Sequence, residues 1–126
     1  AMITATEQML AGMPACVEAA MLAKMSDRGQ ISGCVVDGPL ALDVALCKEA
    51  AEIKKLKSEV AGDADCCVFP SIEAANVFYK FAGHFCPGVK MAAMVAGAKA
   101  PCVLSSRADS TETKLNSIAL AALTAK

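Results

Sequence analysis

Residues 90–115, which read KMAAMVAGAKAPCVLSSRADSTETKL, constrain the fold of this chain more than any other stretch. Two short apolar runs, 91–96 and 101–104, are bounded by Gly and Pro, and such runs predict buried strands. A helix is predicted to begin directly afterwards. Asp109 is a favourable N-cap, and Glu112 three residues later completes the spacing of a capping box.

Ser106 and Arg107 therefore lie between the end of a predicted strand and the start of a predicted helix. That helix has an apolar side that includes Leu115, Ile118 and Leu123, at helical spacing. Unpaired backbone N–H groups and the positive end of the helix dipole favour an anion at such a point. A phosphate group is the obvious candidate.

The rest of the chain alternates helical and strand patterns. The predicted helices cover 17–25, 40–56 and 71–83, and the predicted strands cover 2–6, 31–36 and 66–69. This alternation predicts an α/β fold in which helices alternate with a mostly parallel sheet. Ligands in such folds bind at the carboxyl ends of the strands. Turns containing Asp37 and Gly38, Pro70, and Ser106 with Arg107 follow predicted strands, so we expect them to line one cleft.

Composition excludes several classes of function. The net charge is -1 with a pI of about 5.8, and aromatic residues make up 4% of the chain, so neither a basic surface nor a stacking platform for nucleic acid is expected. No apolar run approaches the roughly 20 residues of a membrane span, and the first residues do not resemble a signal peptide. We expect a cytoplasmic protein. Its mean hydropathy of +0.46 predicts apolar surface that a partner covers, and hence a homo-oligomer.

The seven cysteines show no metal-binding pattern. None are spaced C-x-x-C, and the single histidine, His84, has no neighbouring ligand pair. We expect the cysteines to be small buried hydrophobic residues in a reducing compartment, and we expect no metal site.

Three segments together indicate a family. VDGPLALD (36–43), PSIEAANVFYK (70–80) and AAMVAGAKAPCVLSSRADSTETKL (92–115) resemble, in this order and spacing, the C-terminal part of the phosphate acetyl/butyryltransferase family, nearest to its butyryl-transferring branch. The resemblance implies a three-layer fold like that of isocitrate and isopropylmalate dehydrogenases. It also implies that residues 1–126 are the C-terminal part of a longer chain whose N-terminal part is absent. Segment 91–126 either packs on this part or returns to the missing lobe, and the family architecture favours the second.

The resemblance implies transfer of butyryl or a similar short acyl group from coenzyme A to inorganic phosphate, in fermentation and short-chain fatty acid metabolism. Acyl-CoA and phosphate would be substrates, and no cofactor would be bound. Phosphate acetyltransferase, a same-fold enzyme for fatty acyl groups and a non-catalytic acyl-CoA-sensing module are the alternatives. Because the family's cleft also draws groups from the N-terminal part, we expect the 126-residue chain alone to be inactive.

The resemblance also assigns roles to particular residues. Arg107 would bind anionic phosphate, and Ser106 would donate a hydrogen bond near the thioester sulfur or the oxyanion. Asn76 either faces the cleft from the first turn of its helix or caps that helix. Asp37 and Gly38 either orient a loop at the CoA and phosphate cleft or simply form a turn.

The chain departs from the acetyl-transferring branch next to the Ser-Arg pair. Ala108 and Thr113 stand where that branch has Gly and an Asp thought to act as a base, so no base role passes to Thr113. Asp109 is close enough to be suspected, but helix capping explains it more simply. Lys80 either meets a CoA phosphate or is a solvated helix lysine, and His84 is expected to be structural.

Overall fold

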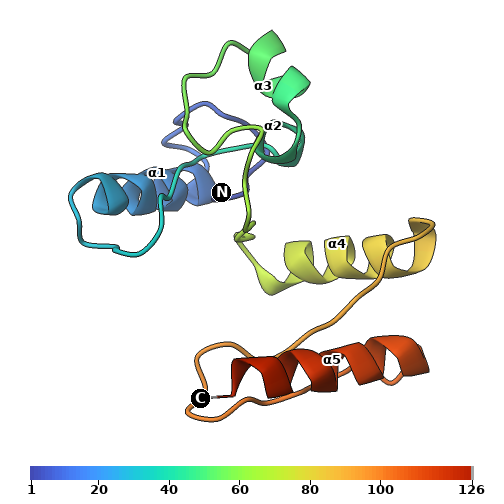
Figure 1. Ribbon diagram of the computed structural model, residues 1–126. Helices are drawn as coiled ribbons and strands as arrows, with labels where there is room; N and C mark the ends of the chain where they lie inside the picture. Colours follow the sequence, from blue (N-terminus) through green and yellow to red (C-terminus); the bar gives the residue numbers. More distant parts are fainter. Residues whose placement is uncertain (126) are drawn as a thin grey trace. The chain divides into compact units, whose positions relative to one another are not determined.

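The computed structural model describes residues 1–125, which form two compact units, Ala1–Val77 and Phe78–Lys126, with the boundary inside one helix (Figure 1). The helices in the described part are α1 (Pro14–Asp27), α2 (Leu42–Leu46), α3 (Lys48–Ile53), α4 (Ile72–Phe85) and α5 (Thr111–Thr124). None of these helices is long and apolar enough to cross a membrane.

Three short segments of the first unit pair in parallel. Met2 bridges Val68 and Ile3 bridges Leu40, so the first residues of the chain lie between the other two segments. Backbone hydrogen bonds hold this ladder, at 2.8 Å from Ile3 N to Val68 O and 3.1 Å from Leu40 N to Met2 O. Parallel pairing is thereby confirmed for the predicted strands at the N-terminus and before Pro70. The pairing consists of isolated bridges and not of a continuous sheet.

The predicted buried strand 31–36 is wrong. Val35 is 63% exposed, and Gly33 has a left-handed φ of 86°. The side chain of Ser26 holds this segment instead, because its Oγ accepts from Val36 N at 3.1 Å. A side-chain anchor of this kind replaces the backbone ladder that a strand requires.

The predicted helix 40–56 is also wrong as a single element. It is divided into α2 and α3 by Cys47, whose φ of -121° and ψ of 114° are extended. In a continuous helix the carbonyls of Val44 and Ala45 would accept from residues four positions later. Here Gly62 N donates to Val44 O at 2.7 Å, and Ala64 N donates to Ala45 O at 3.2 Å. The loop after α3 therefore takes the acceptors that would continue the helix.

The core of the first unit surrounds this break. Its buried members are Ile3, Leu40, Val44, Ala45, Ala51 and Val60.

The helix predicted at 17–25 is confirmed as α1, which begins with proline at its first turn, buries Cys16 and Ala19, and ends before Arg28. The helix predicted at 71–83 is confirmed as α4, and Ser71 Oγ accepts from Ala74 N at 3.3 Å, as an N-cap does.

In the second unit, α5 confirms the helix predicted after the Ser-Arg pair. The N-cap is Ser110, not Asp109, because Ser110 Oγ accepts from Thr113 N at 3.1 Å. Fully buried Ser117 fastens α5 to the segment before the hairpin. Its Oγ donates to Thr113 O at 2.7 Å and accepts from Ala93 N at 3.0 Å.

The two apolar runs before α5 form a hairpin contact, not buried strands. Val95 bridges Cys102 in antiparallel orientation, with 2.9 Å from Val95 N to Cys102 O. Val103 is 38% and Leu104 78% exposed, so the prediction that both runs are buried is wrong for this chain.

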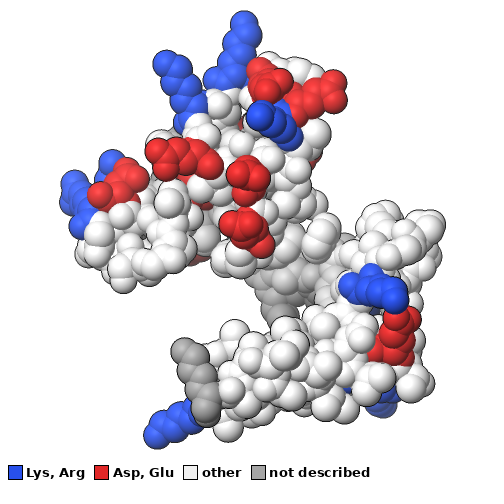
Figure 2. Space-filling view, in the orientation of Figure 1, with Lys and Arg blue, Asp and Glu red and all other residues white. Residues whose placement is uncertain are grey.

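Much apolar surface is exposed. On the face drawn in Figure 2, charged side chains gather around α1, α2 and α3, whereas the surface over α4 and α5 is mostly uncharged. α4 has no buried residue in the described structure. The ring centres of Phe81 and Phe85 stack 5.9 Å apart, and the two side chains are 57% and 73% exposed.

All seven cysteines are free thiols, but only Cys16 is buried, so the expectation of mostly buried cysteines is wrong here.

We predict that Gly38→Ala destabilises the first unit. Gly38 is buried, and a Cβ at this position would lie 2.6 Å from Met2 Cβ and 3.0 Å from Met2 O. Overpacking of this kind should lower the free energy of unfolding by about 1–3 kcal/mol, measured by urea denaturation. Gly12→Ala is the matched control, because no atom lies within 4 Å of its added Cβ. The control should stay within about 0.5 kcal/mol of the wild type. Equal stabilities for the two variants would contradict the prediction.

Candidate functional site

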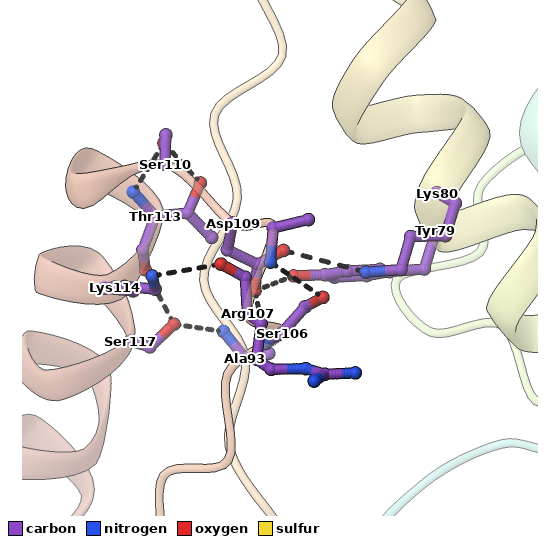
Figure 3. Close-up of polar contacts among 11 residues, drawn as sticks. Tyr79, Lys80, Ala93, Ser106, Arg107, Asp109, Ser110, Thr113, Lys114 and Ser117 are labelled. Atoms are coloured by element: carbon purple, nitrogen blue, oxygen red, sulfur yellow. Dashed lines mark hydrogen bonds and ion pairs between the residues drawn. The ribbon is translucent and has the colours of Figure 1, made fainter.

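The Ser-Arg pair lies in a turn, 106–109, whose first and last residues hydrogen-bond to each other. Ser106 N donates to Asp109 Oδ2 at 2.8 Å, and Asp109 N donates back to Ser106 O at 3.1 Å (Figure 3). Ser106 Oγ also accepts from Ala108 N at 3.4 Å. Ser106 and Asp109 thus close a four-residue turn, in which the return bond goes to the Ser106 carbonyl and not to its side chain as a capping box would require.

The Asp109 side chain is the centre of this arrangement. It is 6% exposed, its Oδ2 also accepts from the Tyr79 hydroxyl at 3.4 Å, and its Oδ1 lies 3.7 Å from Lys80 Nζ. The same ammonium lies 5.0 Å from the centre of the Tyr79 ring. A buried carboxylate is tolerated only when its charge is balanced and its oxygens have donors, and these neighbours provide both.

The surroundings of Tyr79 change the pKa of its hydroxyl group. Burial raises the pKa of Tyr79 above its usual value, and the negative charge of Asp109 and the hydrogen bond to it raise that pKa further. The phenol therefore keeps its proton at neutral pH and remains a donor. Its contribution to stability is present below the ordinary pKa of a tyrosine and is lost as the pH rises through the elevated value.

Arg107 has a fixed backbone and an open side chain. Its carbonyl accepts from Lys114 Nζ at 3.4 Å, across the first turn of α5. No residue among 1–125 forms a hydrogen bond or ion pair with its exposed guanidinium, which extends away from Asp109 in Figure 3. A planar, permanently charged group held in this way can bind a phosphate or carboxylate through two parallel hydrogen bonds.

Two expectations about the turn need correction. The N–H of Ser106 is not available to an anion, because the Asp109 carboxylate already accepts it. Asp109 does not cap α5, since Ser110 performs that role. The Thr113 hydroxyl accepts from Ser110 Oγ at 3.0 Å, which is a capping contact.

A cavity of about 180 Å³ adjoins the turn within the second unit. Tyr79, His84, Met91, Asp109 and Thr113 are among the residues that line it. The cavity is therefore continuous with the polar contacts that hold the Ser-Arg pair. In the described part of the chain, no group of three or more His, Cys, Asp or Glu side chains could hold a metal ion.

The other candidate residues belong to the first unit. Asp37 Oδ1 accepts from Gly38 N at 2.8 Å, and Asp37 O accepts from Met2 N at 2.8 Å. Asn76 is exposed in the second turn of α4, not the first, so it does not cap that helix. Ser106 and Arg107 thus share one turn of the second unit, whereas the other three candidates lie in the first unit.

Sequence reasoning missed the contribution of α4 to this turn. Nothing in the sequence places Tyr79 at this turn, and Lys80 was expected to meet a CoA phosphate or solvent. Both contact Asp109, which lies 30 residues after Tyr79. A tyrosine followed by a lysine on a helix carries no local signal for such a contact, because the pairing depends on the path of the intervening chain.

Comparisons with known proteins agree on one family. The sequence model described as phosphate acetyl/butaryl transferase matches residues 1–122. A phosphate butyryltransferase of Clostridium acetobutylicum is 57% identical over 98% of this chain and 40% of its own length. A phosphate acetyltransferase of Thermotoga maritima is 52% identical over 98% of this chain and 42% of its own length.

A solved structure gives the same result for the fold. The crystal structure of a branched-chain phosphotransacylase from Enterococcus faecalis matches 96% of this chain and 43% of its own chain, with a TM-score of 0.84 and 35% identity. The chain thus spans about 40% of the length of the curated relatives it matches. With a family model that covers nearly all of its residues, this chain belongs to the phosphate acetyl/butyryltransferase family.

Proposed function

We propose that this chain is the C-terminal part of an enzyme that transfers butyryl or a similar short acyl group from coenzyme A to inorganic phosphate. The observation that carries the proposal is the open guanidinium of Arg107 beside Ser106, on a turn whose backbone is fixed at both ends. Membership of the family supports the reaction class. The length of the relatives supports a second part of the enzyme that supplies the rest of the cleft.

The chemistry requires charge stabilisation more than covalent help from the protein. A phosphate oxygen attacks the thioester carbonyl, the carbonyl oxygen becomes negative, and the C–S bond then breaks to release the CoA thiolate and an acyl phosphate. We assign Arg107 to the phosphate and to the charge that develops on it. Ser106 Oγ accepts from Ala108 N, and no residue among those described accepts its hydroxyl proton, so that proton is free for the oxyanion or the departing sulfur.

The relatives of this chain carry names for two different acyl groups. Relatives named for butyryl transfer and for acetyl transfer are 57% and 52% identical to this chain, so identity does not separate the two substrates. Acetyl transfer and transfer of longer fatty acyl groups are therefore alternatives. A non-catalytic acyl-CoA sensor is a further alternative, against which the open Arg107 beside Ser106 counts.

For the complete protein we propose the three-layer arrangement of isocitrate and isopropylmalate dehydrogenases. The parallel pairing around Ile3 supports it. We also propose that 91–126 returns to the remaining lobe, which the exposure of Leu104 supports. Self-association is proposed for the same physical reason, since the exposed aromatic residues of α4 need a cover. The cytoplasmic location stays a prediction from composition.

The direct test measures release of free CoA from butyryl-CoA and acetyl-CoA by the full-length protein, with and without phosphate. We expect phosphate-dependent release that is faster with butyryl-CoA. A preference for acetyl-CoA would keep the reaction and change the acyl group. Tight binding of acyl-CoA with no release of CoA would replace the enzyme by a sensor.

Arg107→Ala should reduce turnover without unfolding the full-length protein. Loss of one preorganised donor to a transition-state charge lowers kcat by about 10²–10³-fold. Arg28→Ala is the matched control, because Arg28 is the other arginine of the chain and lies exposed after α1. Thermal unfolding of both variants should resemble the wild type. Unchanged kcat/KM in Arg107→Ala would remove the assignment.

The 126-residue chain alone should release no CoA in the presence of phosphate. The anion-binding groups expected from the other part of the enzyme are needed to enclose the thioester and exclude water. The measurement is the same release assay at high protein concentration, with the full-length protein as the positive control. Measurable turnover by the isolated chain would show that the second unit needs no further groups.

A further inference from the structure

We propose that Asp109 is a positioning residue, which fixes the Ser106–Arg107 turn for catalysis through its buried carboxylate and takes no part in proton transfer. The proposal rests on the proposed function for its kinetic consequence. Its structural basis is the contact between the turn and α4, which involves Tyr79 and Lys80.

The carboxylate joins two parts of the second unit. Oδ2 accepts from Ser106 N at 2.8 Å in the turn and from the Tyr79 hydroxyl at 3.4 Å on α4. Oδ1 faces Lys80 Nζ at 3.7 Å on the next residue of α4. Removing Asp109 therefore separates the turn from the helix and leaves the N–H of Ser106 without its acceptor.

The same contacts argue against a role in proton transfer. The Asp109 side chain is 6% exposed, and both of its oxygens already face donors. A general base must reach the proton that it removes, directly or through one water. This carboxylate points toward Tyr79 and the Ser106 backbone, whereas the Arg107 guanidinium extends in another direction (Figure 3).

A fixed turn matters because orientation contributes much of the rate. Ser106 and Arg107 are adjacent, so their side chains keep a defined relation only while the backbone between them is held. A displacement of about 1 Å at a reacting group can reduce the rate by about 10²-fold. The Asp109 contact holds the Ser106 end of the pair, and Lys114 holds the carbonyl of Arg107.

The kinetic experiment compares Asp109→Ala with Asp109→Asn in the full-length protein. Asp109→Ala should lower kcat by about 10²-fold, with a smaller change in KM for acyl-CoA. The asparagine keeps one oxygen as acceptor for Ser106 N, so it should recover about tenfold of that loss, the value of one retained hydrogen bond. A general base would show no such rescue, because an amide cannot accept the proton.

Two further variants separate positioning from general effects of charge and folding. Tyr79→Phe removes one donor to Asp109 and keeps the ring, so kcat should fall by up to about tenfold. Glu112→Gln makes the same charge change as Asp109→Asn, at an exposed residue that pairs with Lys90 at 2.9 Å. Its kcat should stay within about twofold of the wild type, since exposed ion pairs contribute little.

A spectroscopic experiment reads the contact without any turnover. The chain has one tyrosine and no tryptophan, so the absorbance of tyrosinate in the 126-residue chain reports Tyr79 alone. Because the charge of Asp109 helps to raise the pKa of Tyr79 above 10.0, Asp109→Asn should lower that pKa and Glu112→Gln should leave it unchanged. Circular dichroism of each variant confirms that the helices are retained.

The outcomes are separable. Wild-type kcat in a folded Asp109→Ala, or an Asp109→Asn as inactive as the alanine variant, would overturn the positioning role. An unchanged Tyr79 pKa in Asp109→Asn would overturn the contact itself. If the wild-type protein releases no CoA, the proposed function fails, and the tyrosine titration still decides whether Asp109 holds the turn to α4.

Discussion

The buried carboxylate of Asp109 is the interaction on which the candidate site depends. A nearly buried negative charge is unfavourable unless donors surround it, and Ser106, Tyr79 and Lys80 supply those donors from two separate segments. Satisfying the charge therefore also joins the turn to α4. Because these donors satisfy Asp109, the Arg107 guanidinium is not used for that purpose and stays exposed. An exposed cation beside a free hydroxyl is suited to stabilise an anionic transition state.

Polar contacts also organise the remainder of each unit. In the first unit, the loop after α3 donates to Val44 and Ala45 and so ends α2, while Ile3 and Leu40 close the core from the parallel ladder. In the second unit, buried Ser117 fastens the segment before the hairpin to α5. Each unit has few layers, so large apolar side chains remain on the surface. That surface fits a chain that spans about 40% of the length of its relatives.

Local signals in the sequence worked where the partners of a residue are near it in the chain. The helical spacing over 17–25, Ser71 before α4 and the apolar periodicity of α5 each lie inside or beside the helix they predict. The order and spacing of three segments also indicated the family correctly, because its model matches residues 1–122. The single helix expected over 40–56 does not form, because backbone N–H groups of a later loop, including that of Gly62, bond to carbonyls of α2.

The sequence by itself determined the helices near 17–25 and 71–83, the family, and the position of Ser106 and Arg107 before a helix. Only the tertiary structure decided that Tyr79 and Lys80 hold Asp109, and that the strand patterns of the first unit form isolated bridges. The physical reason is that caps and periodicity are properties of neighbouring residues. The donors around a buried charge are set by distance in space, and two of the three here, Tyr79 and Lys80, lie on α4, before the long connection to α5.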